Sequence, residues 1–300
     1  MRSLTSSRSP RPSSRHDDHA LIAPRRLAVS VVTVMLAHQR SGSNYLTTLL
    51  TAHPNVLLLR EPFSLHTPRF RELDLVPWHS QDFDPQVLHP SLADDPATVF
   101  YLKDLRVFLR RLSQSGYLAG FKETLLFEKV AWLRAFEPSL ALIHLVRDPR
   151  AVIASVLRHP EAAEWNYEHA VARYLRDYGP PVPGLDITDA LGLAIASWAI
   201  RLTELSRAVE DLPAHSVRFE DMVTNPLAAT QAILRKSGLA LDATQEAAAT
   251  EFAEVSRGGP YSSYRDADEA LGRWRHDLSR ADLGRIERSL GGLMATWGYL

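Results

Sequence analysis

Apolar and β-branched residues occur along the chain in short runs with few polar interruptions. Residues 27–37 (LAVSVVTVMLA) and 140–146 (LALIHLV) lack the alternation of apolar and polar positions that marks a half-buried strand. This is typical of strands buried on both faces of a parallel sheet. Shorter runs at 56–59, 120–126 and 215–219 predict further strands.

Stretches with helical periodicity separate these runs. The clearest is an apolar stripe that we interpret as core: Leu191, Ile195, Trp198, Leu202, Leu205 and Val209. Other helices are predicted at 44–52, 101–113, 130–136 and 227–236, and from Ser279 toward Tyr299. Asp148 and Asn225 each precede a proline, the signature of a helix N-cap followed by Pro at the first helical position.

Strands that alternate with helices predict an α/β protein: a three-layer sandwich with a mostly parallel central sheet and a right-handed first crossover. Residues 27–300 are expected to form a single domain. Residues 1–26, rich in Ser, Arg and Pro, are expected to be a disordered tail, and residues 62–97 to form loops and short helices. On the helix at 101–113 we expect a solvated face carrying Arg106, Arg110 and Arg111.

Composition narrows the function. The net charge is −1 and the pI about 6.9, which argues against nucleic-acid binding through bulk positive charge. The chain has no cysteine, and therefore no disulfide framework and no zinc–thiolate site. No apolar run reaches the roughly 20 residues that span a bilayer, and residues 1–26 have no apolar signal core, so we expect a cytoplasmic protein. The preference for Arg over Lys is typical of a GC-rich, bacterial genome.

A polar turn follows the first predicted strand and precedes a helix. Backbone N–H groups and the helix dipole converge at such a turn and favour an anion. Gly42 permits close backbone approach, Ser41 and Ser43 offer donors, and Arg40 adds charge. A polar turn capped by serine is an equally good interpretation of these residues. The turn lacks the Lys and second Gly of G-x-x-x-x-G-K-[ST], which counts against a kinase that uses ATP and Mg²⁺.

A second basic element lies where the strand at 140–146 ends. Arg147 follows that strand, and Ser155 comes eight residues later, about two helical turns on. Both can reach one anion at the carboxyl edge of the sheet, where open α/β folds bind ligands. The alternative is that Arg147 pairs with Asp148 and that Ser155 is a helix surface residue.

Four segments, in order over residues ~30–300, resemble the sulfotransferase family that uses 3′-phosphoadenylyl sulfate (PAPS). Residues 39–46 (QRSGSNYL) resemble its 5′-phosphosulfate loop, in the Arg form of carbohydrate and bacterial members, and 145–150 (LVRDPR) with Ser155 its 3′-phosphate element. Residues 218–226 (RFEDMVTNP) resemble its strand–Glu-Asp–Asn-Pro connector, and 272–278 (GRWRHDL) its C-terminal tryptophan segment.

The resemblance implies a phosphate-binding strand–loop–helix (P-loop-like) and roles for individual residues. Residues implied at the 5′-phosphosulfate are Arg40, Ser41, Gly42, Ser43 and Asn44. Arg147 and Ser155 are implied at the 3′-phosphate, and Tyr45 at the adenine. Arg257, in Arg257-Gly258-Gly259, is a further candidate for phosphate, although its distance from Gly272 departs from the family's pattern.

Sulfuryl transfer needs a base for the acceptor proton and cations on the sulfate and leaving oxygens, and requires no metal. Cytosolic members carry a catalytic His two residues after a strand Lys, where this chain has Thr124 after Lys122. Carbohydrate-type members carry Glu-Pro after the second strand, which matches Glu61-Pro62. We therefore prefer Glu61 as the base, with His66 as runner-up. Glu61 is alternatively a salt-bridge partner of Arg60 or a buried Arg, and Lys122 either stabilises the bridging oxygen or extends from a strand end toward water.

These observations predict an enzyme that transfers a sulfuryl group from PAPS to a hydroxyl or amine of a small-molecule, carbohydrate or lipid acceptor and releases 3′-phosphoadenosine 5′-phosphate (PAP). A nucleotide kinase and a non-catalytic PAPS- or PAP-binding protein are the alternatives. No nucleic-acid partner is expected, and the sequence is compatible with a homodimer.

Overall fold

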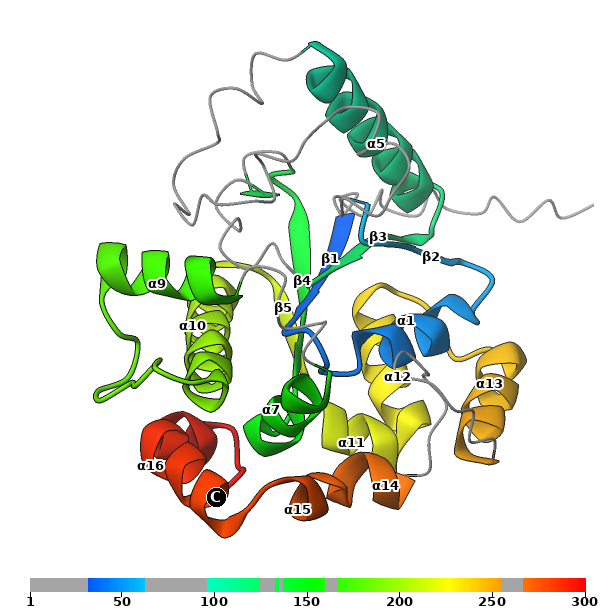
Figure 1. Ribbon diagram of the computed structural model, residues 1–300. Coiled ribbons are helices and arrows are strands. Elements are labelled where there is room, and N and C mark those ends of the chain that lie inside the picture. The colour runs from blue at the N-terminus through cyan, green and yellow to red at the C-terminus, as the bar shows by residue number, and fades with distance from the viewer. Residues whose placement is uncertain (1–31, 63–95, 125–132, 135–136, 160–166, 255–266) are drawn as a thin grey trace, which may run out of the picture.

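The computed structural model describes residues 32–62, 96–124, 133–134, 137–159, 167–254 and 267–300 (Figure 1). Five parallel strands form its sheet in the order β2-β3-β1-β4-β5. Their bounds are β1 Val32–Ala37, β2 Val56–Arg60, β3 Leu118–Glu123, β4 Leu140–Val146 and β5 Ala214–Arg218. All five strands predicted from the apolar runs are therefore confirmed; residues 27–31 of the first run lie outside the described residues.

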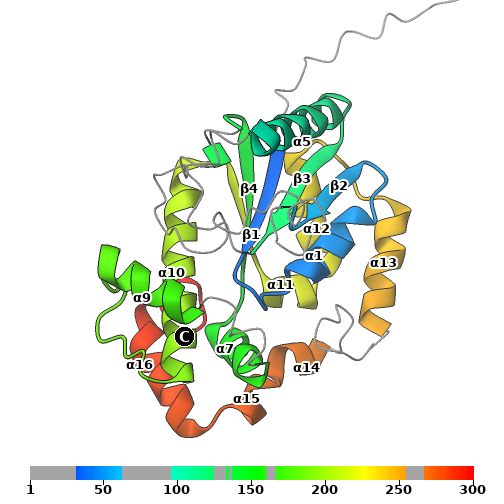
Figure 2. The same ribbon diagram turned by 45° about the horizontal axis from the view of Figure 1, so that its top comes forward.

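Helices cover both faces of this sheet (Figures 1 and 2). On one face lie α5 (Pro96–Gln114), α9 (Tyr167–Tyr178) and α10 (Ala190–Asp211), and on the other α1 (Ser43–Thr51), α12 (Pro226–Lys236) and α13 (Ala243–Glu254). Successive residues of β1 supply the two cores: Val34 and Leu36 pack under α10, and Met35 and Ala37 under α1. The predicted three-layer α/β sandwich is confirmed.

The remaining helices gather at the carboxyl edge of the sheet. They are α7 (Pro149–Arg158), α11 (Phe219–Thr224), α14 (Ala267–Gly272), α15 (Trp274–Asp277) and α16 (Arg280–Thr296). The predicted caps are confirmed, because the Asp148 side chain accepts from the Arg150 N–H and that of Asn225 from the Ala228 N–H. Ser279 caps α16. Most of the helix predicted at 130–136 lies outside the described residues.

One face of α5 differs from the prediction. Arg110 donates from Nε and Nη2 to the two carboxylate oxygens of Glu137, at 2.6 and 2.8 Å, and Arg106 Nε lies 3.5 Å from the same carboxylate. Burial acts to raise the pKa of Glu137, but hydrogen bonds from Arg110 and Ser139 lower it to about 2. The predicted solvated face is right for Arg111, which is exposed, and right in part for Arg106 and Arg110, whose side chains are 35% and 36% exposed. The prediction did not include their pairing with Glu137, a buried carboxylate that needs a cation.

Candidate active site at the carboxyl edge of β1 and β4

The turn after β1 has an unusual backbone. Arg40 and Gly42 have φ angles of +67° and +86°, and the Ser41 N–H donates to the His38 carbonyl at 3.2 Å. A Cβ built on Gly42 would lie 2.4 Å from the Phe219 ring, closer than any side chain tolerates. Gly42 is therefore required both by its φ and by the approach of α11 to the turn.

Arg40 and Ser155 meet in this site. Arg40 Nε donates to Ser155 Oγ at 3.0 Å, because β1 and β4 are neighbours and the helices that follow them start side by side at the same edge. Arg147 joins them by donating from Nη1 to the Arg40 carbonyl at 2.9 Å. The two basic elements that the sequence pointed to therefore form one site.

Arg147 is held from two further sides. Its Nη2 donates to the Ala270 carbonyl on α14 at 2.7 Å, and its Cζ lies 4.1 Å from the centroid of the Phe219 ring. The alternative partner, Asp148, pairs instead with Arg150 at 2.8 Å. Arg147 is therefore aimed by the turn, by α11 and by α14, and not by its sequence neighbour.

The side chains around the turn suit an anion. Ser41 is 1% exposed, and its Oγ has no hydrogen-bond partner among the described residues, although a buried hydroxyl normally has one. Ser43 is buried, and Asn44 lies half-buried in the first turn of α1. Tyr45 packs against the core under α1, and burial raises its pKa to about 12. An acceptor for the Ser41 hydroxyl is what a bound phosphate or sulfate oxygen would supply.

The preferred base and the strand lysine contact each other. Lys122 Nζ donates to Glu61 Oε1 at 2.5 Å, and Thr124 Oγ1 donates to the same oxygen at 3.1 Å. The side chain of Lys122 is 3% exposed and that of Glu61 35%. Arg60, the alternative partner, donates instead to Thr48 Oγ1 at 2.8 Å. Lys122 was expected either at the bridging oxygen or extended toward water, and its pair with Glu61 was not predicted. The pair forms because β2 and β3 are neighbouring parallel strands in which Arg60 lies beside Lys122.

A model of the Sulfotransferase family matches residues 33–243, a span that contains the turn, Glu61, Lys122, Arg147 and Ser155. The chain belongs to the sulfotransferase family.

Two kinds of relative agree with this assignment. Human carbohydrate sulfotransferase 6 is 25% identical over 327 aligned positions, covering 90% of this chain and 80% of the relative. Among solved structures, mouse sulfotransferase SULT7A1 complexed with PAP superposes with a TM-score of 0.51 at 14% identity, over 89% of this chain and 86% of that one. The sulfotransferase domain from the curacin biosynthetic pathway gives 0.50 at 16% identity, over 86% and 96%. The structural likeness shows the fold.

Two predicted site residues of this sulfotransferase, His66 and Arg257, lie outside the described residues. Within the described residues, no helix is long and apolar enough to cross a membrane. The same part of the chain contains no group of three His, Asp or Glu side chains placed to hold a metal ion.

His38 belongs to the site but was not predicted from the sequence. Its Nδ1 lies 2.5 Å from the Gln39 carbonyl, and its Nε2 lies 3.4 Å from Arg201 Nη1 and 3.5 Å from Ser197 Oγ. Burial, and next the charge of Arg201, lower the pKa of His38 well below its usual value. A neutral ring with its proton on Nδ1 satisfies these contacts, so His38 links the turn to α10. The sequence signal that could have identified His38 is its place directly after a buried strand, where a polar residue faces the site.

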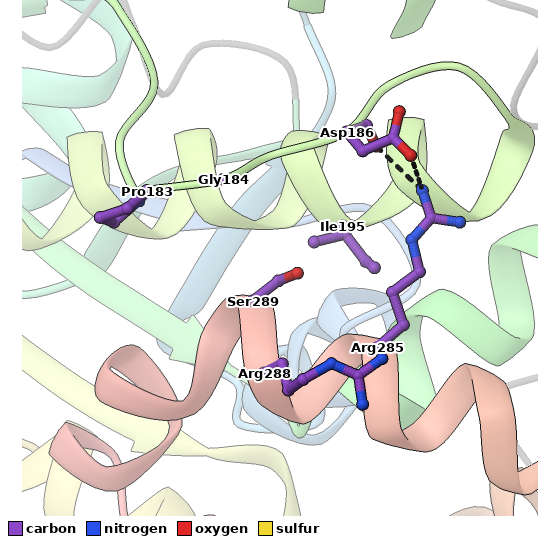
Figure 3. Close-up of a pocket in the computed structure, with 7 residues that line it drawn as sticks. All are labelled: Pro183, Gly184, Asp186, Ile195, Arg285, Arg288 and Ser289. Carbon is purple, nitrogen blue, oxygen red and sulfur yellow. Dashed lines mark hydrogen bonds and ion pairs between the residues drawn. The ribbon is translucent and has the colours of Figure 1, made fainter.

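The sulfotransferase also has a cavity of about 320 Å³ away from this site, between α16, α10 and the segment before α10 (Figure 3). It is lined by Pro183, Gly184, Asp186, Ile195, Arg285, Arg288 and Ser289. Arg285 is already paired with Asp186 and Asp189. None of the predicted site residues lines this cavity.

Proposed function

We propose that this sulfotransferase uses PAPS as its donor, transfers the sulfuryl group to a hydroxyl or an amine, and releases PAP. The observation that carries the proposal is the convergence of Arg40, Arg147 and Ser155 on one site, with Arg40 Nε 3.0 Å from Ser155 Oγ. A nucleotide with phosphates at both ends of its ribose needs two cationic contacts, and guanidinium groups bind phosphate by paired hydrogen bonds.

The donor would be held by the turn and by α7. Backbone N–H groups from Gly42 to Asn44, at the start of α1, would bind the 5′-phosphosulfate with Arg40, and the unpartnered Ser41 hydroxyl would donate to one of its oxygens. The Ser41 N–H is used within the turn, where it donates to the His38 carbonyl. Arg147 and Ser155 would bind the 3′-phosphate. A guanidinium has five N–H donors, so Arg40 can keep its bond to Ser155 while it binds the donor. Tyr45 would contact the adenine.

The transfer step then needs the protein to hold the acceptor in line with sulfur, to accept the acceptor proton and to stabilise the leaving oxygen. The acceptor oxygen or nitrogen attacks sulfur in line, the bond from sulfur to the bridging oxygen of the 5′-phosphate breaks, and that oxygen leaves with the electron pair on PAP. The acceptor proton passes to the carboxylate of Glu61, whose Oε2 has no partner among the described residues. Lys122 would stabilise charge on the bridging oxygen while it orients Glu61 through Oε1.

The acceptor is a small molecule, a carbohydrate or a lipid. The name of the human relative makes carbohydrate hydroxyls the first class to test.

The test is to incubate the protein with sulfur-labelled PAPS and separate pools of sugars, phenols, lipids and amines, with and without EDTA. We expect label in one pool and stoichiometric release of PAP that EDTA does not prevent. PAP should raise the melting temperature with concentration, as a ligand of the native state must, and ATP with Mg²⁺ should do much less. Tight PAP binding without transfer to any pool would favour a non-catalytic binding protein, and consumption of ATP a kinase.

A further inference from the structure

A closed ring of hydrogen bonds holds the start of α7, directly after Arg147. The Asp148 side chain accepts from the Arg150 N–H at 2.9 Å, and the Asp148 N–H donates to Glu220 Oε1 at 3.0 Å. The second oxygen of Glu220 accepts from the Tyr299 hydroxyl at 3.0 Å. Arg150 Nη2 donates to the Tyr299 carbonyl at 2.9 Å, which closes the ring. Residues from α7, α11 and the segment after α16 are thereby tied together.

The way in which α16 ends brings Tyr299 into this ring. Gly298 has a φ of +69°; its N–H donates to the Ala295 carbonyl at 3.1 Å, and the Tyr299 N–H donates to the Met294 carbonyl at 2.9 Å. These two bonds form a Schellman motif, which reverses the chain after a helix and favours Gly at this position. Tyr299 is consequently turned back against α7 and is 7% exposed.

The ring is partly buried among aromatic and charged side chains. The guanidinium of Arg150 packs over the Trp274 ring, with Cζ 4.5 Å from its centroid, and donates to Glu287 at 3.3 Å. Arg218 packs over the Tyr299 ring at 4.6 Å. Hydrogen bonds in such surroundings are stronger than in water, and they restrict the geometry of the groups that they join.

Two consecutive residues of α11 hold two consecutive residues at the end of β4. The Phe219 ring lies against the Arg147 guanidinium at 4.1 Å, and Glu220 accepts from the Asp148 N–H. Any shift of Glu220 therefore moves the surface on which Arg147 rests, together with the backbone that follows Arg147.

We propose that Glu220 and Tyr299 are positioning residues that aim Arg147 at the 3′-phosphate of the donor. This inference rests on the proposed function, because it assigns Arg147 to that phosphate. Neither Glu220 nor Tyr299 touches the donor; they act through Asp148 and Phe219 on the direction of one guanidinium.

The test compares two nucleotides that differ only in the 3′-phosphate, PAP and adenosine 5′-phosphate. Tyr299→Phe keeps the ring packed but removes the donor to Glu220. We expect PAP to bind about 3- to 10-fold more weakly, the range that one lost hydrogen bond allows, and adenosine 5′-phosphate to bind as before. Glu220→Gln should shift the two dissociation constants in the same selective way. The measurement is calorimetric titration at constant ionic strength.

The matched control is Tyr117→Phe, because Tyr117 lies just before β3, at the amino edge of the sheet, and packs half-buried against the core. It should change neither dissociation constant. In the Arg147→Ala background, Tyr299→Phe should have no further effect on PAP, since the group that it positions is gone.

Equal weakening of both nucleotides, or an effect of Tyr299→Phe that persists without Arg147, would mean that the ring only stabilises the fold, and would overturn the inference alone. A wild-type protein that does not distinguish PAP from adenosine 5′-phosphate would overturn the proposed function along with it.

Discussion

Arg40 and Ser155 are 115 residues apart in the chain, and Arg40 Nε donates to Ser155 Oγ at 3.0 Å. The proposed function assigns Arg40 to the 5′-phosphosulfate of the donor and Ser155 to the 3′-phosphate. If so, their direct contact couples the two phosphate sites. A change at one is expected to alter the other, and this can be measured.

The first prediction concerns this coupling. Arg40→Ala should weaken PAP binding by about 2–5 kcal/mol, the cost of removing one partner of a desolvated charge pair. Ser155→Ala should cost less, and the double variant should lose less than the sum of the two, because residues in contact are not additive. Titration calorimetry gives the cycle. Ser289→Ala, in α16, is the matched control and should be neutral; strict additivity would show that the contact carries no binding energy.

The second prediction concerns Arg147. Arg147→Ala should weaken PAP by about 2–5 kcal/mol and adenosine 5′-phosphosulfate, which lacks the 3′-phosphate, by far less. Competition binding with both nucleotides measures the difference. If the two weaken equally, Arg147 serves the fold and does not recognise the 3′-phosphate.

The third prediction concerns the stability of the Gly42→Ala variant, for which Gly116→Ala is the matched control. Both glycines have positive φ, +86° and +88°, but a Cβ on Gly42 meets Phe219 at 2.4 Å whereas one on Gly116 meets nothing within 4 Å. The backbone strain is thus shared, and only Gly42→Ala also overpacks. Its free energy of unfolding should fall by about 1–3 kcal/mol more than that of Gly116→Ala. Denaturant melts measure this, and Phe219→Ala should rescue part of the loss; equal losses would refute the close packing.

The fourth prediction concerns the base. Glu61→Gln keeps the shape of the side chain but removes its basic form, so turnover should fall by about 10²–10⁴-fold, the usual range for a general base. PAP affinity should change little. Thr124→Val is the control, since it removes one hydrogen bond to Glu61 and leaves the carboxylate charged; its turnover should fall less than tenfold, as for one lost hydrogen bond.

Turnover of the His66→Ala variant separates the remaining outcomes. We expect a milder loss than for Glu61→Gln. An active Glu61→Gln with an inactive His66→Ala would reverse the assignment. A Glu61→Gln variant that loses stability and PAP affinity together would give Glu61 a structural role instead, which its contact with the buried Lys122 makes a real alternative.

The fifth prediction concerns acid stability. His144 is fully buried in β4 against Trp297, neither ring nitrogen has a hydrogen-bond partner among the described residues, and burial lowers its pKa from 6.5 to about 4. The unfolded chain therefore binds the proton more readily than the folded one between pH 6.5 and 4. The contribution of His144 to the free energy of unfolding is therefore complete above pH 6.5. It is lost as the pH drops through this window, which lowers the free energy of unfolding by about 3 kcal/mol.

Replacing His144 by Phe should remove that share of the pH dependence, because the ring is kept and the titrating group is lost. Denaturant melts at pH 7 and pH 4.5 measure it. His276→Phe, at an exposed position on α15, should leave the pH dependence unchanged. An unaltered slope in His144→Phe would show that His144 is not held neutral.

The local features of this protein could be predicted from its sequence. The run at 140–146 predicted β4 with its bounds, and Asp148-Pro149 predicted the start of α7, because both signals depend on residues within one turn or one strand. The polar turn after β1 and Arg147 were found for the same reason. The resemblance to the family then implied roles for Glu61 and Ser155.

The partners of these residues could not be predicted. The pairing of Arg110 with Glu137 was not predicted, and neither was that of Lys122 with Glu61, which is 61 residues away in the chain. Periodicity shows which face of an element is buried, but not which charged group on another element lies opposite to it.

The sequence by itself therefore determined the succession of strands and helices along the chain, the helix caps, the polar turn and the basic residues that follow the strands. These features follow from backbone preference and the burial of apolar faces. The tertiary structure alone decided that Arg147 rests on Phe219 and Ala270, that Arg40 meets Ser155, and that Tyr299 closes the ring around Asp148. Those contacts depend on the order of the strands in the sheet and on helix packing. Both bring together segments far apart in the chain once the apolar faces have been buried.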